Sequence, residues 1–248
     1  GVAGTLFVHK IAGSLAEQGA DLDAVVEAAT RTISSMASIG MSLDTCTVPG
    51  SAKEERIPAG KAELGLGIHG EAGVQQVLFA GAAGAMDMVL DKLGAKIGSG
   101  AHVAILNNLG GTTPLEMSVL AHELATSPKA QNIKHIIGPA PLMTSLDMHG
   151  FSVSILPLDA ENTRHLAAPV ALSAWPGIQA IVPVRTLPLP DGLSPIKPIP
   201  SANEKTAKVI AHCCDLLIAA EEDLNLLDAK SGDGDTGSTL ATAARALK

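Results

Sequence analysis

The chain has 248 residues, of which 46% are hydrophobic and only 2% aromatic, with one Trp and no Tyr. This length can furnish a substantial core for one large domain or two ordinary ones, filled by aliphatic side chains and Met. A formal net charge of -8 without a local Lys/Arg cluster, and the lack of stacking side chains, argue against nucleic acid as a partner.

The first half of the chain alternates helical and strand-like patterns. Apolar residues at helical spacing predict a helix from Thr5 to about Gln18, ended by Gly19. Asp21 is a good N-cap for a second helix that reaches about Ser38. The expected elements that follow are a strand over residues 41–48, a strand over 62–68, one or two helices over 74–93, a strand over 102–107 and a helix beginning near 114.

The alternation continues to about residue 167. It comprises an expected strand over residues 134–138, a helix over 142–148, a strand over 151–156 and a helix over 160–167. Strands that alternate with helices predict a layered α/β domain, with ligands on loops at the strand ends.

The stretch from Pro183 to Pro200 holds six of the 15 prolines and predicts a semi-rigid extended linker. Beyond it, helical spacing over residues 206–227 and 238–247 predicts a second module that starts all-helical. Because the chain begins with Gly1 rather than Met and stops at Lys248 inside a helical pattern, we expect both ends to be cut.

A glycine-rich segment, residues 65–73, places His69 among four glycines at the end of an expected strand. Glycines let the backbone turn sharply and let a ligand approach closely. A neutral imidazole there can hydrogen-bond a polar ligand or attack an electrophilic carbonyl through its unprotonated nitrogen. An ordinary turn histidine satisfied by the backbone has the same spacing, so both interpretations stay open at this point. The other seven histidines lack such surroundings.

An acidic segment between two expected helices carries Asp228, Asp233 and Asp235, separated by five and two residues. Intervening glycines allow tight folding, so the three carboxylates can converge on a hard cation through oxygen ligands. The pattern indicates magnesium that bridges carboxylates and nucleotide phosphates, with backbone N–H groups of residues 236–238 at a helix N-terminus. A solvated acidic turn with an N-cap is the alternative.

Two weaker features precede the linker. The loop Asn108-Leu109-Gly110-Gly111-Thr112-Thr113 joins a strand to a helix, and it either lines a substrate pocket or only serves the turn. Trp175 is interpreted as a packing anchor rather than a ligand platform.

The three cysteines make neither an even disulfide framework nor a Cys-x-x-Cys pair, which indicates free thiols in a reducing compartment. The sequence contains no signal-peptide pattern and no uninterrupted apolar run of about 18 residues. We therefore expect a cytoplasmic protein that does not associate with membranes.

Several long motifs occur together in order, and through them the chain resembles the ATP-dependent dihydroxyacetone kinases. In this family, which includes the animal triokinase/FMN cyclases, one chain joins a substrate-binding K domain, a linker and an ATP-binding L domain. The matching segments are Gly4-Thr5-Leu6-Phe7-Val8-His9-Lys10-Ile11-Ala12-Gly13, Val48-Pro49-Gly50-Ser51, Glu63-Leu64-Gly65-Leu66-Gly67-Ile68-His69-Gly70-Glu71-Ala72-Gly73, Leu106-Asn107-Asn108-Leu109-Gly110-Gly111 and Gly232-Asp233-Gly234-Asp235.

The resemblance implies roles for both segments. His69 would form a covalent hemiaminal with the carbonyl of dihydroxyacetone or glyceraldehyde, so it would be both a catalytic and a substrate-binding residue. Asp228, Asp233 and Asp235 would bind Mg²⁺. Asp235, Thr236, Gly237 and Ser238 would contact the phosphates of ATP.

The resemblance also implies the domain organisation. An α/β K domain with a mixed sheet would cover residues 1–182, followed by a proline-rich linker over 183–204. The start of an all-helical L domain, a helical barrel in the family, would cover residues 205–248. A homodimer is also implied.

Some family features are missing from these 248 residues. A full member is about twice as long, its Gly-Gly-Gly-Ser-Gly-His-Glu segment and a catalytic Asp would precede Gly1, and most of the L domain would follow Lys248. We therefore expect negligible kinase activity from this chain alone. The alternatives to a kinase are the FMN cyclase (FAD-AMP lyase) activity of the same family and a non-catalytic regulator that keeps the K fold.

Overall fold

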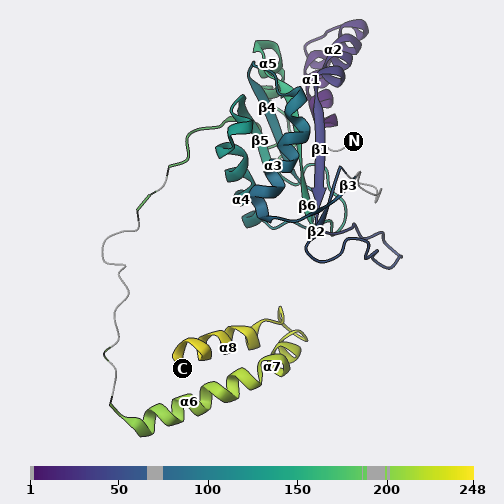
Figure 1. Ribbon diagram of the computed structural model, residues 1–248. Coiled ribbons are helices and arrows are strands. Elements are labelled where there is room, and N and C mark those ends of the chain that lie inside the picture. Colours follow the sequence, from purple (N-terminus) through teal and green to yellow (C-terminus); the bar gives the residue numbers. More distant parts are fainter. Residues whose placement is uncertain (1–2, 66–74, 186, 189–198, 200–201) are drawn as a thin grey trace. The chain divides into compact units, whose positions relative to one another are not determined.

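The computed structural model describes residues 3–65, 75–185, 187–188, 199 and 202–248 (Figure 1). The chain divides into two compact units, Gly1–Thr186 and Leu187–Lys248. Each helix among the described residues is too short or too polar to cross a membrane. The domain limits expected near residues 182 and 204 stay predictions.

Unit 1 is built on one seven-stranded sheet with the strand order β3-β2-β1-β6-β4-β5-β7. All neighbouring strands are antiparallel except β4 and β5, which are parallel, so the sheet is mixed. The predicted α/β fold with a mixed sheet is confirmed. The strands are β1 Ala37–Ser42, β2 Lys61–Leu64, β3 Gln75–Leu78, β4 His102–Asn108, β5 Ile133–Ala140, β6 Gly150–Pro157 and β7 Ile178–Ala180.

Helices cover both faces of this sheet (Figure 1). Every residue of β4 is buried, and its side chains alternate between two cores. Leu106 packs in the core with α3 (Gly81–Leu93) and α4 (Pro114–Thr126), whereas Ile105 packs with α1 (Thr5–Glu17) and α5 (Ala160–Ala167). Burial on both faces explains why residues 103–106 of this strand are all apolar rather than alternating with polar residues.

Side-chain caps fix the starts of three helices of unit 1. The carboxylate of Asp21 accepts a hydrogen bond from Ala24 N–H at the start of α2 (Leu22–Ser35). Thr113 and Glu116 form a reciprocal capping box at α4, which has Pro114 in its first turn. Asp159 caps α5 by accepting a hydrogen bond from Asn162 N–H, and all three helices begin where the sequence predicted.

In unit 1 two expected elements have the wrong bounds, one expected helix is absent, and one strand was missed. The strand expected over 41–48 is β1, which pairs with β6 along its whole length and ends at Ser42. The expected helical stretch 74–93 contains β3 before α3, because residues 75–78 pair with β2. Residues 142–148 are not helical. Their backbone groups form hydrogen bonds with the side chain of Asn107 at the end of β4 and with the backbone of the residues that follow β4. The short strand β7 was not expected.

Unit 2 contains three helices in its described part, α6 (Glu204–Ala219), α7 (Glu221–Asp228) and α8 (Thr236–Leu247). The single helix expected over 206–227 is interrupted at Ala220, where α6 ends and α7 begins. Cys214, Ala241 and Ala244 are buried among these helices. That this unit is the start of an ATP-binding helical domain stays a prediction.

Candidate metal and phosphate site

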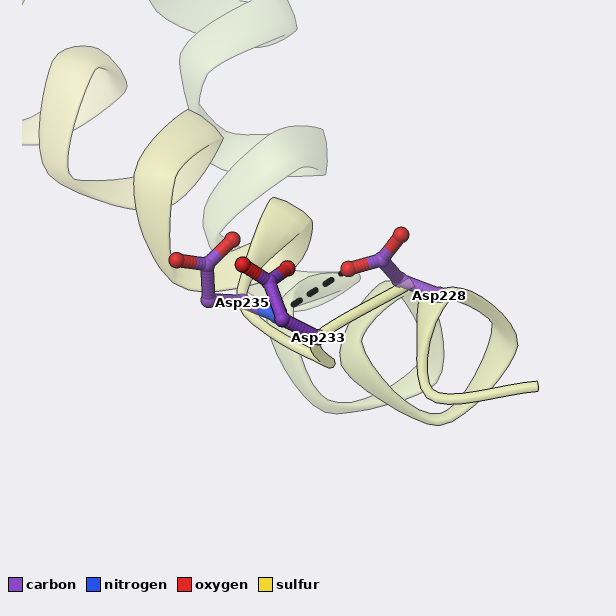
Figure 2. Close-up of side chains that lie close together, drawn as sticks. All are labelled: Asp228, Asp233 and Asp235. Atoms are coloured by element: carbon purple, nitrogen blue, oxygen red, sulfur yellow. Dashed lines mark hydrogen bonds between the residues drawn. The ribbon is translucent and has the colours of Figure 1, made fainter. Parts of the chain in front are cut away.

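The acidic loop between α7 and α8 brings three carboxylates together (Figure 2). Asp228 is the last residue of α7, and Asp233 and Asp235 lie in the loop that leads into α8. One oxygen from each side chain can be chosen so that all three lie within 4.8 Å of one another. The three acids of the sequence pattern therefore share one small volume.

Asp228 also organises the loop that carries the other two acids. Its Oδ2 accepts hydrogen bonds from the backbone N–H groups of Gly234 at 2.9 Å, Asp235 at 3.1 Å and Thr236 at 3.4 Å. Figure 2 shows the bond to Asp235. Gly232 passes so close to the same carboxylate that a Cβ atom there would overlap Asp228 Oδ1. Only glycine therefore fits at position 232 without moving Asp228.

The electrostatics of the cluster differ between its members. Burial alone would raise the pKa of Asp228, but the hydrogen bonds from the backbone of Thr236, Gly234 and Asp235 together lower it. The pKa of Asp235 is raised, chiefly by the neighbouring charge of Asp233 and then by desolvation. A cation between the carboxylates would relieve this repulsion.

The donor set fits a hard divalent cation. Mg²⁺ prefers oxygen ligands and is usually held by one or a few carboxylates together with water and substrate phosphates. Asp233 and Asp235 are exposed, and Asp228 keeps Oδ1 away from the three backbone bonds, so each acid can offer an oxygen. Exposed acidic groups are also common without a metal, so the binding itself stays a prediction.

The N-terminus of α8 follows directly and contains the predicted phosphate-contacting residues. Ser238 N–H donates to Asn225 Oδ1 at 3.0 Å, and its hydroxyl accepts from Asn225 Nδ2 at 3.0 Å. The N-cap residue Asp235 makes no side-chain capping bond, while Thr236 N–H is bound by Asp228 and Gly237 is buried against α7. Asn225 was missed by sequence reasoning, because an Asn inside a helical pattern gives no sign of a partner thirteen residues away.

His69 and the segment 66–74 lie outside the described residues. The flanking strands β2 and β3 pair with each other, so the segment joins two neighbouring strands at one end of the sheet. Glu63 on β2 is buried and forms an ion pair with Arg56 at 3.0 Å. The sequence did not single out this pair, because Arg56 lies in a polar loop without a periodic pattern.

The two asparagines at the end of β4 stabilise the turns around them through hydrogen bonds. Asn107 Oδ1 accepts from the N–H groups of Leu142 and Met143, at 2.9 and 2.8 Å, and its Nδ2 donates to Met143 O and Ser152 Oγ. Asn108 in turn donates to Thr112 O and accepts from Gly110 N–H. Both asparagine side chains are thus used to hold turns.

Comparison with known proteins identifies the family. Residues 1–174 match the Dak1 domain. The chain is 39% identical to the dihydroxyacetone kinase of Citrobacter freundii and 33% identical to the human triokinase/FMN cyclase, in both cases over 100% of the chain. The chain belongs to the dihydroxyacetone kinase family.

The family match has a structural counterpart. The crystal structure of the Citrobacter freundii kinase aligns with a TM-score of 0.73 at 38% identity, covering 100% of this chain and 46% of that one. The same kinase has been crystallised in complex with AMP-PNP and Mg²⁺. A Dha operon co-activator, DhaQ, aligns with a TM-score of 0.65 at 25% identity over 71% of this chain and 57% of its own.

This dihydroxyacetone kinase relative spans less than half of the curated proteins it matches. It covers 45% of the Citrobacter freundii kinase and 46% of the human triokinase/FMN cyclase.

Proposed function

We propose that this chain is part of an ATP-dependent kinase that phosphorylates dihydroxyacetone or glyceraldehyde. The observation that carries the proposal is the convergence of Asp228, Asp233 and Asp235 at the start of α8. It occurs in a chain whose whole length aligns with a named dihydroxyacetone kinase, and a structure of that kinase contains AMP-PNP and Mg²⁺. A homodimer in the cytoplasm remains part of the same proposal.

The acidic loop would hold the metal and the phosphates. Asp228, Asp233 and Asp235 would bind Mg²⁺, which when bound neutralises charge on the ATP phosphates during phosphoryl transfer. The N-terminus of α8, residues 236–238, would lie against the phosphates, where the helix dipole favours negative charge. Asn225 would keep Ser238 in place through its two hydrogen bonds.

His69 would hold the ketose or aldose. Its unprotonated ring nitrogen adds to the carbonyl carbon, the carbonyl oxygen takes up a proton, and the other ring nitrogen gives one up. Glycerol has no carbonyl and would be rejected. The adduct would fix the terminal hydroxyl for attack on the γ-phosphate, which lowers the entropic part of the barrier.

Metal binding tests the acidic loop directly. Titration of this chain with Mn²⁺, followed by the electron paramagnetic resonance of the free ion, should show one site. Asp233→Asn should weaken that site by about tenfold or more, because it removes one anionic ligand. Asp223→Asn, in the exposed first turn of α7, is the matched control and should leave the affinity unchanged. Equal affinity in both variants would remove the metal site from the proposal.

Substrate capture tests His69 independently of the metal. Dihydroxyacetone labelled with carbon-13 at its carbonyl should show a new tetrahedral carbon resonance in the presence of the intact protein. His69→Ala should abolish that resonance, whereas His122→Ala, an exposed histidine on α4, should retain it. An adduct that survives His69→Ala contradicts this role. We also expect negligible turnover of dihydroxyacetone with Mg-ATP by these 248 residues alone.

A second candidate function is FMN cyclase activity. Relatives at 30–33% identity are named triokinase/FMN cyclase. A lyase reaction at the metal site would need the acidic loop and not His69, so His69→Ala in the intact protein separates the two activities. The similarity to the operon co-activator keeps a non-catalytic regulator as a third candidate, for which neither a covalent adduct nor a metal site is expected.

A further inference from the structure

An apolar cavity of about 150 Å³, partly open to solvent, lies in unit 1. It is bounded by the C-terminal end of β1, the N-terminal end of β6, and the N-terminal halves of α3 and α4. None of the described residues that line it belongs to the acidic loop. Its apolar wall is formed by Met41, Leu43, Ala82, Ala85, Val119 and Phe151.

The size of the cavity limits what it can hold. An engineered cavity of about 150 Å³ with an aliphatic and aromatic lining binds benzene and stays free of water. Met41, Ala85 and Phe151 are buried, whereas Phe79 and Val119 at the mouth are 40% and 42% exposed. A molecule with a hydrocarbon body of this size can therefore enter from solvent and be covered.

Three polar side chains line the wall, Thr112, Glu116 and His149, and they limit which head group such a molecule can carry. Glu116 Oε1 lies 3.1 Å from His149 Nε2, and Glu116 Oε2 accepts the N–H and hydroxyl of Thr113, each at 2.8 Å. Thr112 is already used, since its hydroxyl donates to Gly150 O and accepts from Gly150 N–H.

Glu116 can accept one more hydrogen bond. Each carboxylate oxygen has two lone-pair positions, and at Oε1 one of them faces His149. The hydrogen bond from Thr113 N–H is the main cause of a lowered pKa for Glu116, so the group is ionised at neutral pH. Among the described lining residues there is no Lys or Arg to compete with a cationic ligand.

We propose that this cavity binds a small primary amine whose hydrocarbon body is about the size of a benzene ring. The body would fill the apolar part between α3, α4 and the sheet. The ammonium group would donate to Glu116 Oε1 at the mouth. An anionic head of the same size would be repelled by the carboxylate.

Four probes of one shape test the proposal on the intact chain: benzylamine, benzyl alcohol, toluene and benzoate. Binding is followed by the methyl resonance of Met41, which lines the cavity, with carbon-13-labelled methionine. Benzylamine should bind about three- to tenfold more tightly than benzyl alcohol, given the partial exposure of the carboxylate. Benzoate should not shift the resonance.

Two kinds of variant test separately how the hydrocarbon body and the ammonium group of the ligand contribute to binding. Ala85→Leu should fill the cavity and abolish the response to benzylamine, whereas Ala83→Leu, exposed on the same helix, should not. Ala82→Leu replaces Ala85→Leu if the latter does not fold. Glu116→Gln keeps the capping box while removing the charge, so benzylamine and benzyl alcohol should then bind equally.

The result that overturns the proposal is the absence of any benzylamine response, or one that survives filling of the cavity. Benzoate binding as tight as benzylamine binding would also overturn it, because the head-group preference would be wrong. None of these measurements uses the kinase reaction or a divalent cation. If the cavity does not bind benzylamine, the proposed kinase function is unaffected. If the kinase function is wrong, the amine-binding proposal is likewise unaffected.

Discussion

Asn107 directly precedes a loop that the sequence offered as a candidate wall of a substrate pocket, but its side chain stabilises the fold. It is fully buried at the end of β4, and in α/β domains ligands commonly bind on the loops at strand ends. Three of its four hydrogen bonds hold the backbone of Leu142 and Met143, where the sequence predicted a helix, and the fourth reaches Ser152. A buried amide that satisfies two backbone N–H groups and one carbonyl stabilises a chain segment that has no secondary structure of its own.

Asn107→Ala should therefore destabilise unit 1 by about 3 kcal/mol, since the substitution leaves several buried polar groups unpaired. Urea denaturation followed by circular dichroism measures the change. Asn132→Ala is the matched control, because that side chain makes one hydrogen bond, to Gly98 O, and should cost about 1 kcal/mol or less. Similar losses in both variants would contradict this role for Asn107.

Glu116 gives a prediction about pH. The hydrogen bond from Thr113 N–H is the largest cause of its lowered pKa, so the ionised form is favoured in the folded state. The stability that this provides is complete above the unfolded pKa of about 4.3 and is lost as the pH falls through the lower folded value. Because the side chain is 46% exposed, solvent screening keeps the effect below about 1 kcal/mol.

Glu116→Gln should thus flatten the dependence of the melting temperature on pH in the acidic range. The glutamine still caps α4 but no longer titrates. Glu123→Gln, later in the same helix, should keep the slope of the unmodified chain. If Glu116→Gln melts with that unmodified slope, the capping carboxylate does not couple folding to pH.

The parts of the candidate site that could be predicted are those whose interacting residues lie close together in the sequence. Asp228, Asp233 and Asp235 lie within eight positions, so glycine spacing alone indicated that they can meet. The pairing of Asn225 with Ser238 depends on the angle between α7 and α8, which no local pattern encodes. His69 lies outside the described residues, so its role stays a prediction.

The same distinction holds for whole elements. The start of α4 was predicted from Pro114 at the first helical position, and all of α5 was predicted. The misassigned stretches depend on partners far away in the chain. Residues 75–78 are a strand only because β2 pairs with them, and β7 is a strand only because β5 does. Tertiary pairing overrides weak local preferences in such short segments.

Helix packing in unit 2 depends on one glycine. A Cβ atom at Gly237 would overlap the carbonyl oxygen of Glu221 and lie 2.8 Å from Asn225 Oδ1, so α8 can approach α7 only without a side chain there. Gly237→Ala should cost about 2 kcal/mol and displace the predicted phosphate-contacting residues. Thermal melting and Mn²⁺ affinity should both fall.

Gly13→Ala provides the opposite control. Gly13 lies inside α1, and a Cβ atom there meets nothing within 4 Å. Alanine should stabilise this helix by about 0.5–1 kcal/mol, because glycine costs more backbone entropy. A stabilising Gly237→Ala would show that the close approach of α7 and α8 is not required.

At the scale of the whole molecule, the two units differ in how much apolar surface they bury. The sheet of unit 1 is covered on both faces, with two clusters of buried aliphatic side chains. In unit 2, Cys214, Ala241 and Ala244 are buried, while larger side chains such as Leu226 and Leu247 are 61% and 72% exposed. Small buried side chains contribute little hydrophobic free energy.

We therefore expect unit 2 to open far more readily than unit 1. In hydrogen exchange followed by mass spectrometry, peptides from α6, α7 and α8 should exchange well before peptides from β4 and β6. Mg²⁺ should slow exchange in α7 and α8 and leave β4 unchanged, because a ligand stabilises only the structure that binds it. Asp233→Asn should remove that protection, and Asp223→Asn should keep it. Equal exchange in both units without metal would mean that burial does not set their relative stability.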